Sequence, residues 1–250
     1  MTTHAAAAPG GYVPPADLTS VYVWEWPVRV THWVIAISIV MLSATGIYIG
    51  NPFIIASGEA GSRFVMGTMK VIHAYAAIAF TLAVLSRVLW MFIGNPYSRW
   101  NAFLPVKPGR IKGLIPTLRY YLFFEALPPG FVGHNPLAGL AYLAVFGLYA
   151  VMIVTGLGIY GASADVGSPM RAFTSLVPIV GGLQMARWFH HIVMWLLLGF
   201  SVHHIYSAIL MTIEERNGLM DSIVSGYKII SRSELIATRD GLIDRRELDV

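Results

Sequence analysis

The chain has 250 residues, of which 56% are hydrophobic and only 12% are charged, and its mean hydropathy is +0.64. Soluble domains carry about 25% charged residues, so this composition predicts an integral membrane protein. The net charge of +4 is explained by membrane topology rather than nucleic-acid binding, because Lys and Arg flank the apolar stretches. With no Cys, the chain cannot hold an iron-sulfur cluster through thiolates, attach haem by thioether bonds or form a disulfide.

Four apolar stretches predict an all-α fold, an integral four-transmembrane-helix bundle. Each can hold about 20 apolar residues, the length of one membrane span. We expect helices at about 30–50, 67–93, 138–161 and 188–211. Most Lys and Arg lie before the first helix, after the second or after the fourth, so the positive-inside rule predicts that both termini face the cytoplasm of a bacterial inner membrane.

The rest of the chain is divided by composition. Residues 1–20 are rich in Ala, Gly and Pro, and we expect a flexible cytoplasmic lead. Residues 21–213 would form the transmembrane domain, and residues 214–250 a charged cytoplasmic tail. The loop after the second helix contains LIPTLRYYLFFEAL, an amphipathic segment expected to lie along the membrane surface.

The fourth predicted helix carries four histidines, and helical geometry selects two of them. His190 and His204 are 14 positions apart, which at 100° per residue is about 40° short of four turns. They therefore share one helix face, about 21 Å apart along the axis. His191 and His203 fall out of line with this pair, and we interpret them as packing, supporting or substrate-contacting residues.

Helix direction supplies a partner for each of these two histidines. The first and third helices run outward and the second and fourth run inward, so His32 matches His204 in depth near the cytoplasmic face, while His73 matches His190 near the periplasmic face. Each pair can ligate one haem iron axially from two helices. Two ligands are too few for zinc, so we predict two b haems suited to electron transfer.

Two further residues stand 14 positions after a predicted ligand. Gly46 follows His32, where the lack of a side chain would leave room for a planar cofactor. Arg87 follows His73, and a haem propionate would be a suitable anion for a buried guanidinium. The alternative of another class is a cofactor-free anchor or transporter, in which the histidines bind protons or substrate.

Several motifs together resemble a known family. The opening YVWEWPVRVTHW, the GNPYSR after the second helix, the GHNPLAG before the third and the His-x13-His of the fourth resemble the cytochrome b subunit of membrane-bound nickel-iron uptake hydrogenases. The similarity extends from about Tyr22 to Lys228. It implies a dihaem electron-transfer subunit of a hydrogen:quinone oxidoreductase complex, with His73 and His190 at the proximal haem and His32 and His204 at the distal haem.

The resemblance also implies partners. Nickel-iron hydrogenase small and large subunits would bind at the periplasmic face, and quinone would be reduced near the cytoplasmic side of the lipid bilayer. His134 and Asn135, at the cytoplasmic end of the third helix, can donate hydrogen bonds to a quinone carbonyl, although Asn135 before Pro136 is equally typical of a helix start. The nearest alternative is the cytochrome b subunit of a formate dehydrogenase, because this chain does not specify its electron donor.

Overall fold

The computed structural model describes residues 18–53, 64–104, 106, 108–125, 133–215 and 218–231. Within them, four helices are long and apolar enough to cross a membrane: α1 (Trp26–Gly50), α2 (Val65–Ile93), α4 (Pro136–Ser163) and α5 (Leu183–Glu215). The all-α prediction is thus confirmed in its coarser form, a mostly helical structure with four candidate membrane spans. Most of the expected lead and tail, residues 1–17 and 232–250, lie outside the described residues.

The chain forms two compact units. The bundle unit comprises Trp26–Ile93 and Ala141–Ser207 and so contains most of the four long helices. The terminal unit falls within Met1–Glu25, Gly94–Leu140 and Ala208–Val250. It thus joins segments before the first span, between the second and third, and after the fourth.

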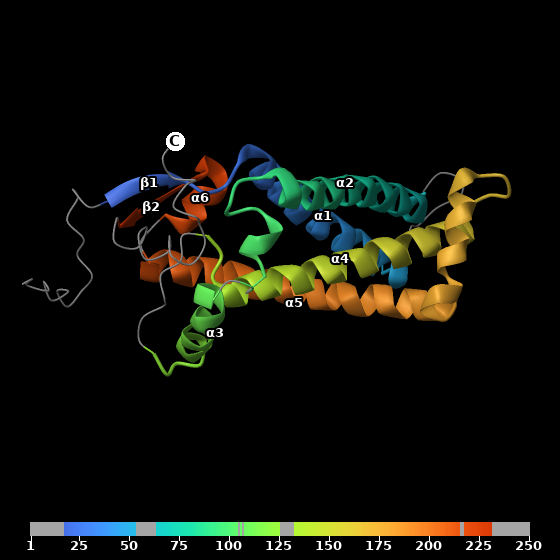
Figure 1. The fold of residues 1–250 in the computed structure, drawn as a ribbon. Helices are drawn as coiled ribbons and strands as arrows, with labels where there is room; N and C mark the ends of the chain where they lie inside the picture. The colour runs from blue at the N-terminus through green and yellow to red at the C-terminus, as the bar shows by residue number, and fades with distance from the viewer. Residues whose placement is uncertain are drawn as a thin grey trace, which may run out of the picture. The chain divides into compact units, whose positions relative to one another are not determined.

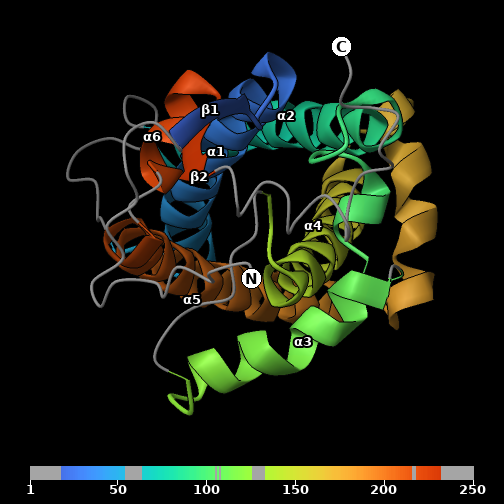
Figure 2. The same cartoon turned by 60° about the vertical axis from the view of Figure 1, so that its left-hand side comes forward.

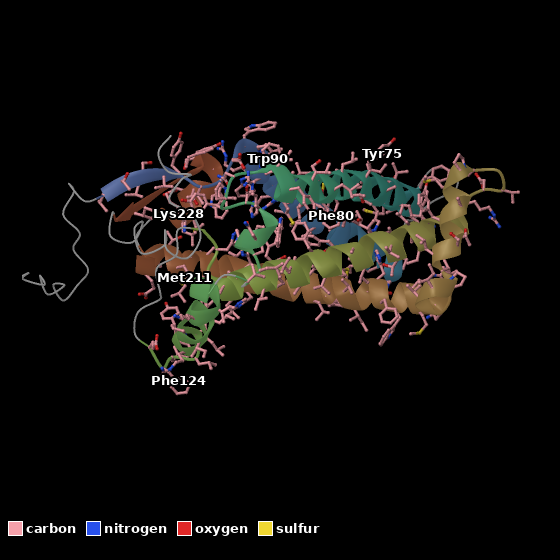
Figure 3. The ribbon with its side chains drawn as sticks, viewed as in Figure 1. Tyr75, Phe80, Trp90, Phe124, Met211 and Lys228 are labelled. Carbon is pink, nitrogen blue, oxygen red and sulfur yellow. The ribbon has the colours of Figure 1, made fainter. Side chains whose placement is uncertain are left out.

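The bundle unit is held together by one apolar core to which all four helices contribute. Figures 1 and 2 show α1, α2, α4 and α5 running alongside one another. Figure 3 shows Phe80 pointing from α2 into the bundle, where it is 4% exposed, whereas Tyr75 points outward and is 71% exposed. The fully packed members of this core are Ile35, Phe80, Ala83, Val84, Val145, Tyr149, Val193 and Leu197.

The connection between α4 and α5 is anchored in the bundle unit by close backbone contact. It contains two 3-10 helices, η4 (Pro169–Leu176) and η5 (Pro178–Val180). A Cβ at Gly161 would lie 2.8 Å from the Thr174 nitrogen and 2.9 Å from the Met170 oxygen, so only glycine lets α4 approach η4 this closely. The segment is therefore fixed against the end of α4.

A small sheet in the terminal unit departs from the all-α prediction. Strand β1 (Leu18–Tyr22) pairs antiparallel with β2 (Tyr227–Ser231), which follows α6 (Leu219–Ser225). Residues 18–20, expected to belong to a flexible lead, are therefore part of a strand. Burial along β2 alternates between exposed and buried residues, the period-two pattern of a strand with one packed face.

Gly226 makes the tight turn from α6 into β2. Its φ is +92°, and a Cβ there would lie 2.6 Å from Cε2 of Tyr22. Both the left-handed backbone and the lack of space require glycine. The end of α6 and the edge of β1 are thereby brought into contact.

The loop after α2 also belongs to the terminal unit. It contains the short η3 (Trp100–Ala102) and the helix α3 (Pro108–Tyr121). The second half of α3 overlaps the segment expected to be amphipathic, residues 114–127. An exposed apolar stripe follows the helical period along α3 and continues into Phe123 and Phe124; its helical members are Ile111, Ile115 and Leu118. This stripe agrees with the expectation that the segment rests on a membrane surface.

Candidate functional site

The first histidine pair of the bundle unit joins α2 to α5. The ring centroids of His73 and His190 are 6.5 Å apart, and the ring planes are inclined by 54°. His73 lies in the third turn of α2 and His190 in the second turn of α5, so the two helices meet near the beginning of each. The matching depths of His73 and His190 along their predicted helices had indicated this pairing, and the structure brings the two residues together.

The second pair joins α1 to α5. The ring centroids of His32 and His204 are 6.3 Å apart, with ring planes inclined by 58°. Phe200, one turn before His204, stacks on its ring at 5.7 Å and 13°. Of the two neighbouring histidines His203 and His204, the second is the one that faces His32, as the helical phase had predicted.

Both distances fit two imidazoles on opposite sides of one metal ion. Two metal-imidazole bonds of about 2.0–2.1 Å, together with about 1.1 Å from each ligating nitrogen to its ring centroid, separate the centroids by about 6.2–6.4 Å. The observed separations are 6.5 Å and 6.3 Å. Two separate pairs of this kind, on three different helices, constitute the candidate site.

Two threonines contact the first pair. Thr45 Oγ1 of α1 lies 2.8 Å from His73 Nδ1, and Thr155 Oγ1 of α4 lies 2.9 Å from His190 Nδ1. Both hydroxyls are buried, with Thr45 at 6% and Thr155 at 2% exposure. Each imidazole is therefore held at Nδ1 by a threonine of a neighbouring helix, α1 for His73 and α4 for His190. The Nε2 nitrogen of each ring is left to bind a metal ion.

A glycine follows each of these threonines and gives the imidazole space. A Cβ at Gly46 would lie 3.4 Å from Cε1 of His73, and one at Gly156 would lie 3.3 Å from Cε1 of His190. These separations are shorter than ordinary carbon-carbon contacts of about 3.5–4.0 Å. Gly46 was predicted to make room for a planar cofactor; the neighbour described here is the His73 ring, and cofactor packing stays a prediction.

An apolar layer separates the two pairs. Along α5, the buried residues Val193 and Leu197 lie between His190 and His204. The 14 positions from one histidine to the other correspond to about 21 Å of helix. Phe80 and Tyr149 meet edge to face in the same core, with centroids 5.0 Å apart. The pairs are thus two distinct sites with packed side chains between them.

Arg87 is buried in the bundle unit. It is 3% exposed, and its guanidinium carbon lies 5.4 Å from the centroid of the Tyr142 ring, within the range of a cation-π contact. Tyr142 in turn stacks on Phe146 at 4.6 Å. The charge is thus held against an aromatic wall of α4, and its predicted role toward a haem propionate remains a prediction.

Two of the sequence motifs meet in the terminal unit. The Glu25 carboxylate of the opening motif accepts hydrogen bonds from the Asn95 backbone N–H at 2.7 Å and from the Ser98 hydroxyl at 2.9 Å. Asn95 also donates through its side-chain amide to the Val23 carbonyl at 3.0 Å. Ser98 is completely buried. These bonds fasten the segment before α1 to the segment after α2.

The third motif joins the same cluster through aromatic contacts. The His134 ring contacts Trp24, at a centroid distance of 4.9 Å, and Phe103, at 5.3 Å. A Cβ at Gly133 would lie 3.4 Å from the Tyr97 ring. Burial raises the pKa of Tyr97 above its usual 10.0, so its phenol stays protonated at neutral pH and can donate a hydrogen bond.

Asn135 has a described structural role. Its side-chain oxygen accepts a hydrogen bond from the Ala138 backbone N–H at 2.7 Å, the usual contact of a helix N-cap. Pro136 follows as the first residue of α4. The hydrogen bond from Ala138 therefore supports the interpretation of Asn135 as a helix start. The side-chain NH₂ of Asn135 is not used in this bond, and its role toward a quinone remains a prediction.

His191 and His203 lie on exposed parts of α5. His191 Nδ1 lies 2.8 Å from the Arg187 carbonyl, and His203 Nε2 lies 3.4 Å from the Ser207 hydroxyl, each within its own helix. A Cβ at Gly50 of α1 would lie 2.8 Å from His191 Nε2, so glycine admits that ring. Both residues are thus outside the two described pairs.

Sequence reasoning missed Thr45 and Thr155. A buried hydroxyl in a membrane helix is common, because threonine can bond to the carbonyl four residues back, so neither residue attracts attention alone. A usable signal was present in the repeated Thr-Gly dipeptide of α1 and α4, at 45–46 and 155–156. The contact of these threonines with the histidines can be recognised only when the rotation of each helix about its axis is known.

Comparison with known proteins identifies the family. The family described as prokaryotic cytochrome b561 matches residues 23–226. The chain belongs to this family. The cytochrome is also 39% identical over 215 residues to a "Probable Ni/Fe-hydrogenase B-type cytochrome subunit" of Cupriavidus necator, which covers 85% of this chain and 88% of the relative. The resemblance indicated by the motifs is therefore confirmed.

Other relatives carry similar names. A "Probable Ni/Fe-hydrogenase 1 B-type cytochrome subunit" of Escherichia coli is 34% identical over 217 residues, covering 85% of this cytochrome and 92% of the relative. The Rhizobium leguminosarum bv. viciae protein, named "Probable Ni/Fe-hydrogenase B-type cytochrome subunit", is 34% identical over 238 residues, covering 94% and 100%. The similarity thus extends over nearly the full length of each chain.

Membership of a b-type cytochrome family implies haem b, and the described residues fit that cofactor. Among residues 18–231, so far as they are described, no group of three or more His, Cys, Asp or Glu side chains could hold a metal ion. A haem iron needs only two protein ligands, because the porphyrin supplies the other four. The histidine pairs meet this requirement in number, in separation and in their location between apolar helices.

Proposed function

We propose that this cytochrome is the dihaem membrane anchor of a periplasm-facing nickel-iron hydrogenase and passes electrons from hydrogen oxidation to the quinone pool. The observation that carries the proposal is the presence of two histidine pairs, at 6.5 Å and 6.3 Å, stacked along α5. Two bound haems would supply reversible one-electron chemistry at two depths of the membrane. The names of the relatives support a hydrogenase as the electron donor.

The chain's own residues would hold these cofactors as follows. His73 and His190 would hold the proximal haem, and His32 and His204 would hold the distal haem. With two histidines bound, the iron would have no position open for oxygen or substrate and would supply electron transfer. Arg87 would neutralise a propionate in its buried position, and Gly46 would leave space beside the proximal site.

The orientation rests on charge and on the small sheet. Pairing of β1 with β2 holds the segments before α1 and after α5 together, which supports the proposal that both lie on one side of the membrane. Arg29 in the first turn of α1, together with the Lys and Arg residues after α5 and in the loop after α2, supports the cytoplasm as that side. The hydrogenase small and large subunits would then bind at the opposite, periplasmic ends of the helices.

Quinone reduction would take place near His134 and Asn135, at the cytoplasmic start of α4. Asn135→Asp is the sharpest test, because aspartate can still accept the capping bond from Ala138 but has no amide donor. We expect the variant to fold normally and to lose quinone reduction and inhibitor binding. Unchanged quinone kinetics would remove Asn135 from the proposed site and leave it as a helix cap.

The main experiment measures haem content in matched variants. The protein would be purified in mild detergent with its bound partners, and haem would be quantified as the pyridine haemochrome. We expect two b haems per chain, a loss of one or both in His190→Ala and His204→Ala, and an unchanged content in the adjacent His191→Ala and His203→Ala. A colourless protein would contradict the proposal and favour a proton or substrate path.

The co-purified subunits identify the electron donor. We expect nickel-iron hydrogenase subunits and hydrogen-dependent reduction of the haem absorption bands. Recovery of formate dehydrogenase subunits, with reduction by formate instead of hydrogen, would keep the dihaem cytochrome but reassign its partner. The haem and partner measurements therefore test two separable parts of the proposal.

A further inference from the structure

We propose that Thr155 and Thr45 are positioning residues that fix the tautomer of His190 and His73 and so lower the reduction potential of the haem between them. The inference rests on the proposed function, because it assigns these two histidines to one haem. It concerns the hydrogen bonds at Nδ1, which lie on the side of each ring away from the ligating nitrogen.

The first step is the direction of the threonine hydroxyl proton. Thr155 Oγ1 donates to the Val151 carbonyl at 2.6 Å, and Thr45 Oγ1 donates to the Met41 carbonyl at 2.7 Å. A hydroxyl has one proton and two acceptor lone pairs. With this proton assigned to the carbonyl in its own helix, each Oγ1 is left to accept a hydrogen bond from another group.

The second step is the tautomer of the imidazoles. His190 Nδ1 lies 2.9 Å from Thr155 Oγ1, and His73 Nδ1 lies 2.8 Å from Thr45 Oγ1. Since each Oγ1 is an acceptor here, the network assigns the proton of each neutral ring to Nδ1. Nε2 then carries the lone pair needed by a metal, as in other sites where a second hydrogen bond orients a histidine ligand.

The third step is the effect on the iron. A ligand N–H that donates a hydrogen bond makes the imidazole a stronger electron donor, which favours ferric over ferrous iron and lowers the potential. The other pair differs in this respect, because His32 Nδ1 is buried without a hydrogen-bond partner among the described residues. The two proposed haem sites therefore differ in hydrogen bonding at Nδ1, which the threonines supply at His73 and His190 and which His32 lacks among the described residues.

Thr155→Val is the main test, because His190 is the simpler of the two ligands. His73 has a second hydrogen-bond partner in the backbone of Leu42, which could retain part of the effect after loss of Thr45. Valine keeps the branched shape of Thr155 and removes the hydroxyl. Thr155→Ser restores the hydroxyl, and Thr81→Val is a matched control, since Thr81 bonds in the same way to Ala77 in α2 at 2.7 Å.

The first readout is a redox titration of the purified complex followed by its visible spectrum. For Thr155→Val we expect the ferric/ferrous equilibrium of one haem to shift about three- to tenfold toward ferrous, an upward change of up to about 59 mV. The other haem should keep its potential, Thr155→Ser should restore the original value, and Thr81→Val should change neither. Unchanged potentials in Thr155→Val, or shifts equal to those of Thr81→Val, would overturn the inference.

A second readout separates this inference from the proposed function. Haem-free protein with ¹⁵N-labelled histidine reports the Nδ1–H and Nε2–H tautomers by NMR, and the His190 signal is assigned by its loss in His190→Ala. We expect Nδ1–H in the original protein and an increased Nε2–H population in Thr155→Val. If no haem binds, the proposed function fails, but this tautomer still decides whether the threonine fixes the ring. An Nε2–H ring in the original protein refutes it.

Discussion

Replacing a glycine of α4 with alanine should have opposite effects at two positions of the same helix. Gly156 faces His190, where a Cβ would lie 3.3 Å from Cε1, whereas a Cβ at Gly147 would have no neighbour within 4 Å among the described residues. Alanine stabilises a helix interior over glycine by about 0.5–1 kcal/mol, and this gain is common to both variants. The contact with the histidine ring is therefore the difference between them.

The expected size follows from the cost of overpacking. Forcing an extra carbon against a packed ring costs about 1–3 kcal/mol. Gly147→Ala should be about 0.5–1 kcal/mol more stable than the original protein, while Gly156→Ala should be neutral to about 2.5 kcal/mol less stable. Because His190 must move, Gly156→Ala should also alter the low-spin ferric EPR signal of one haem and leave the other signal unchanged.

The measurement is thermal unfolding of the holoprotein in detergent, with haem content and EPR spectra recorded on the same samples. Gly147→Ala should keep both EPR signals. Equal shifts in unfolding temperature for the two variants, together with unchanged spectra in Gly156→Ala, would show that the ring and the glycine are not in contact and would refute the reasoning.

Three further predictions concern other parts of the protein. Glu25→Ala removes the acceptor of the Asn95 backbone N–H, whereas the Ser98 hydroxyl can still bond to Asn95 Oδ1 at 2.8 Å. The variant should therefore lower the unfolding free energy by about 1–3 kcal/mol, measured by thermal unfolding against Glu25→Gln, which should lose less. Phe80→Ala should cost about 3–5 kcal/mol by opening a cavity in the bundle core; a cost below 1 kcal/mol would contradict its packing. Gly226→Ala, at a φ of +92°, should increase amide exchange in the β1–β2 sheet, and unchanged exchange would argue against this turn.

The histidine pairs were predictable because residue spacing along one helix gives both the face and the depth of each histidine. A separation of 14 residues places His190 and His204 on one face without knowledge of any other helix. Alternating helix direction then assigns His32 and His73 to opposite ends. The apolar composition of the spans was equally sufficient for the four helices, since length and hydropathy decide membrane insertion.

The contacts around the histidines were not predictable in this way. The approach of Thr155 to His190 depends on how far α4 is rotated and how closely it packs on α5, which neither sequence segment encodes alone. The hydrogen bonds from Asn95 and Ser98 to Glu25 join residues about 70 positions apart. Each motif looked like a local loop signal, and its meaning lay in the contact with another motif.

The β1–β2 sheet was missed because its strands are short and far apart. Each has five residues; β1 lies partly within the expected flexible lead, and β2 lies within the expected charged tail. Alternating burial along residues 227–230 becomes visible only once β1 lies beside them. Local propensity is a weak guide where the partner strand is distant.

The same sheet sets the order in which the protein can assemble. Leu18 pairs with Ser231, so β1 leaves the ribosome roughly 10–40 s before its partner exists, at ordinary rates of synthesis. During that interval its backbone N–H and C=O groups have no strand to bond with. The strands can meet only when an even number of spans separates them, so a chain that skips one helix keeps two unpaired, aggregation-prone edges on opposite sides of the membrane. Closure of the sheet is thus possible only in molecules that have inserted an even number of spans.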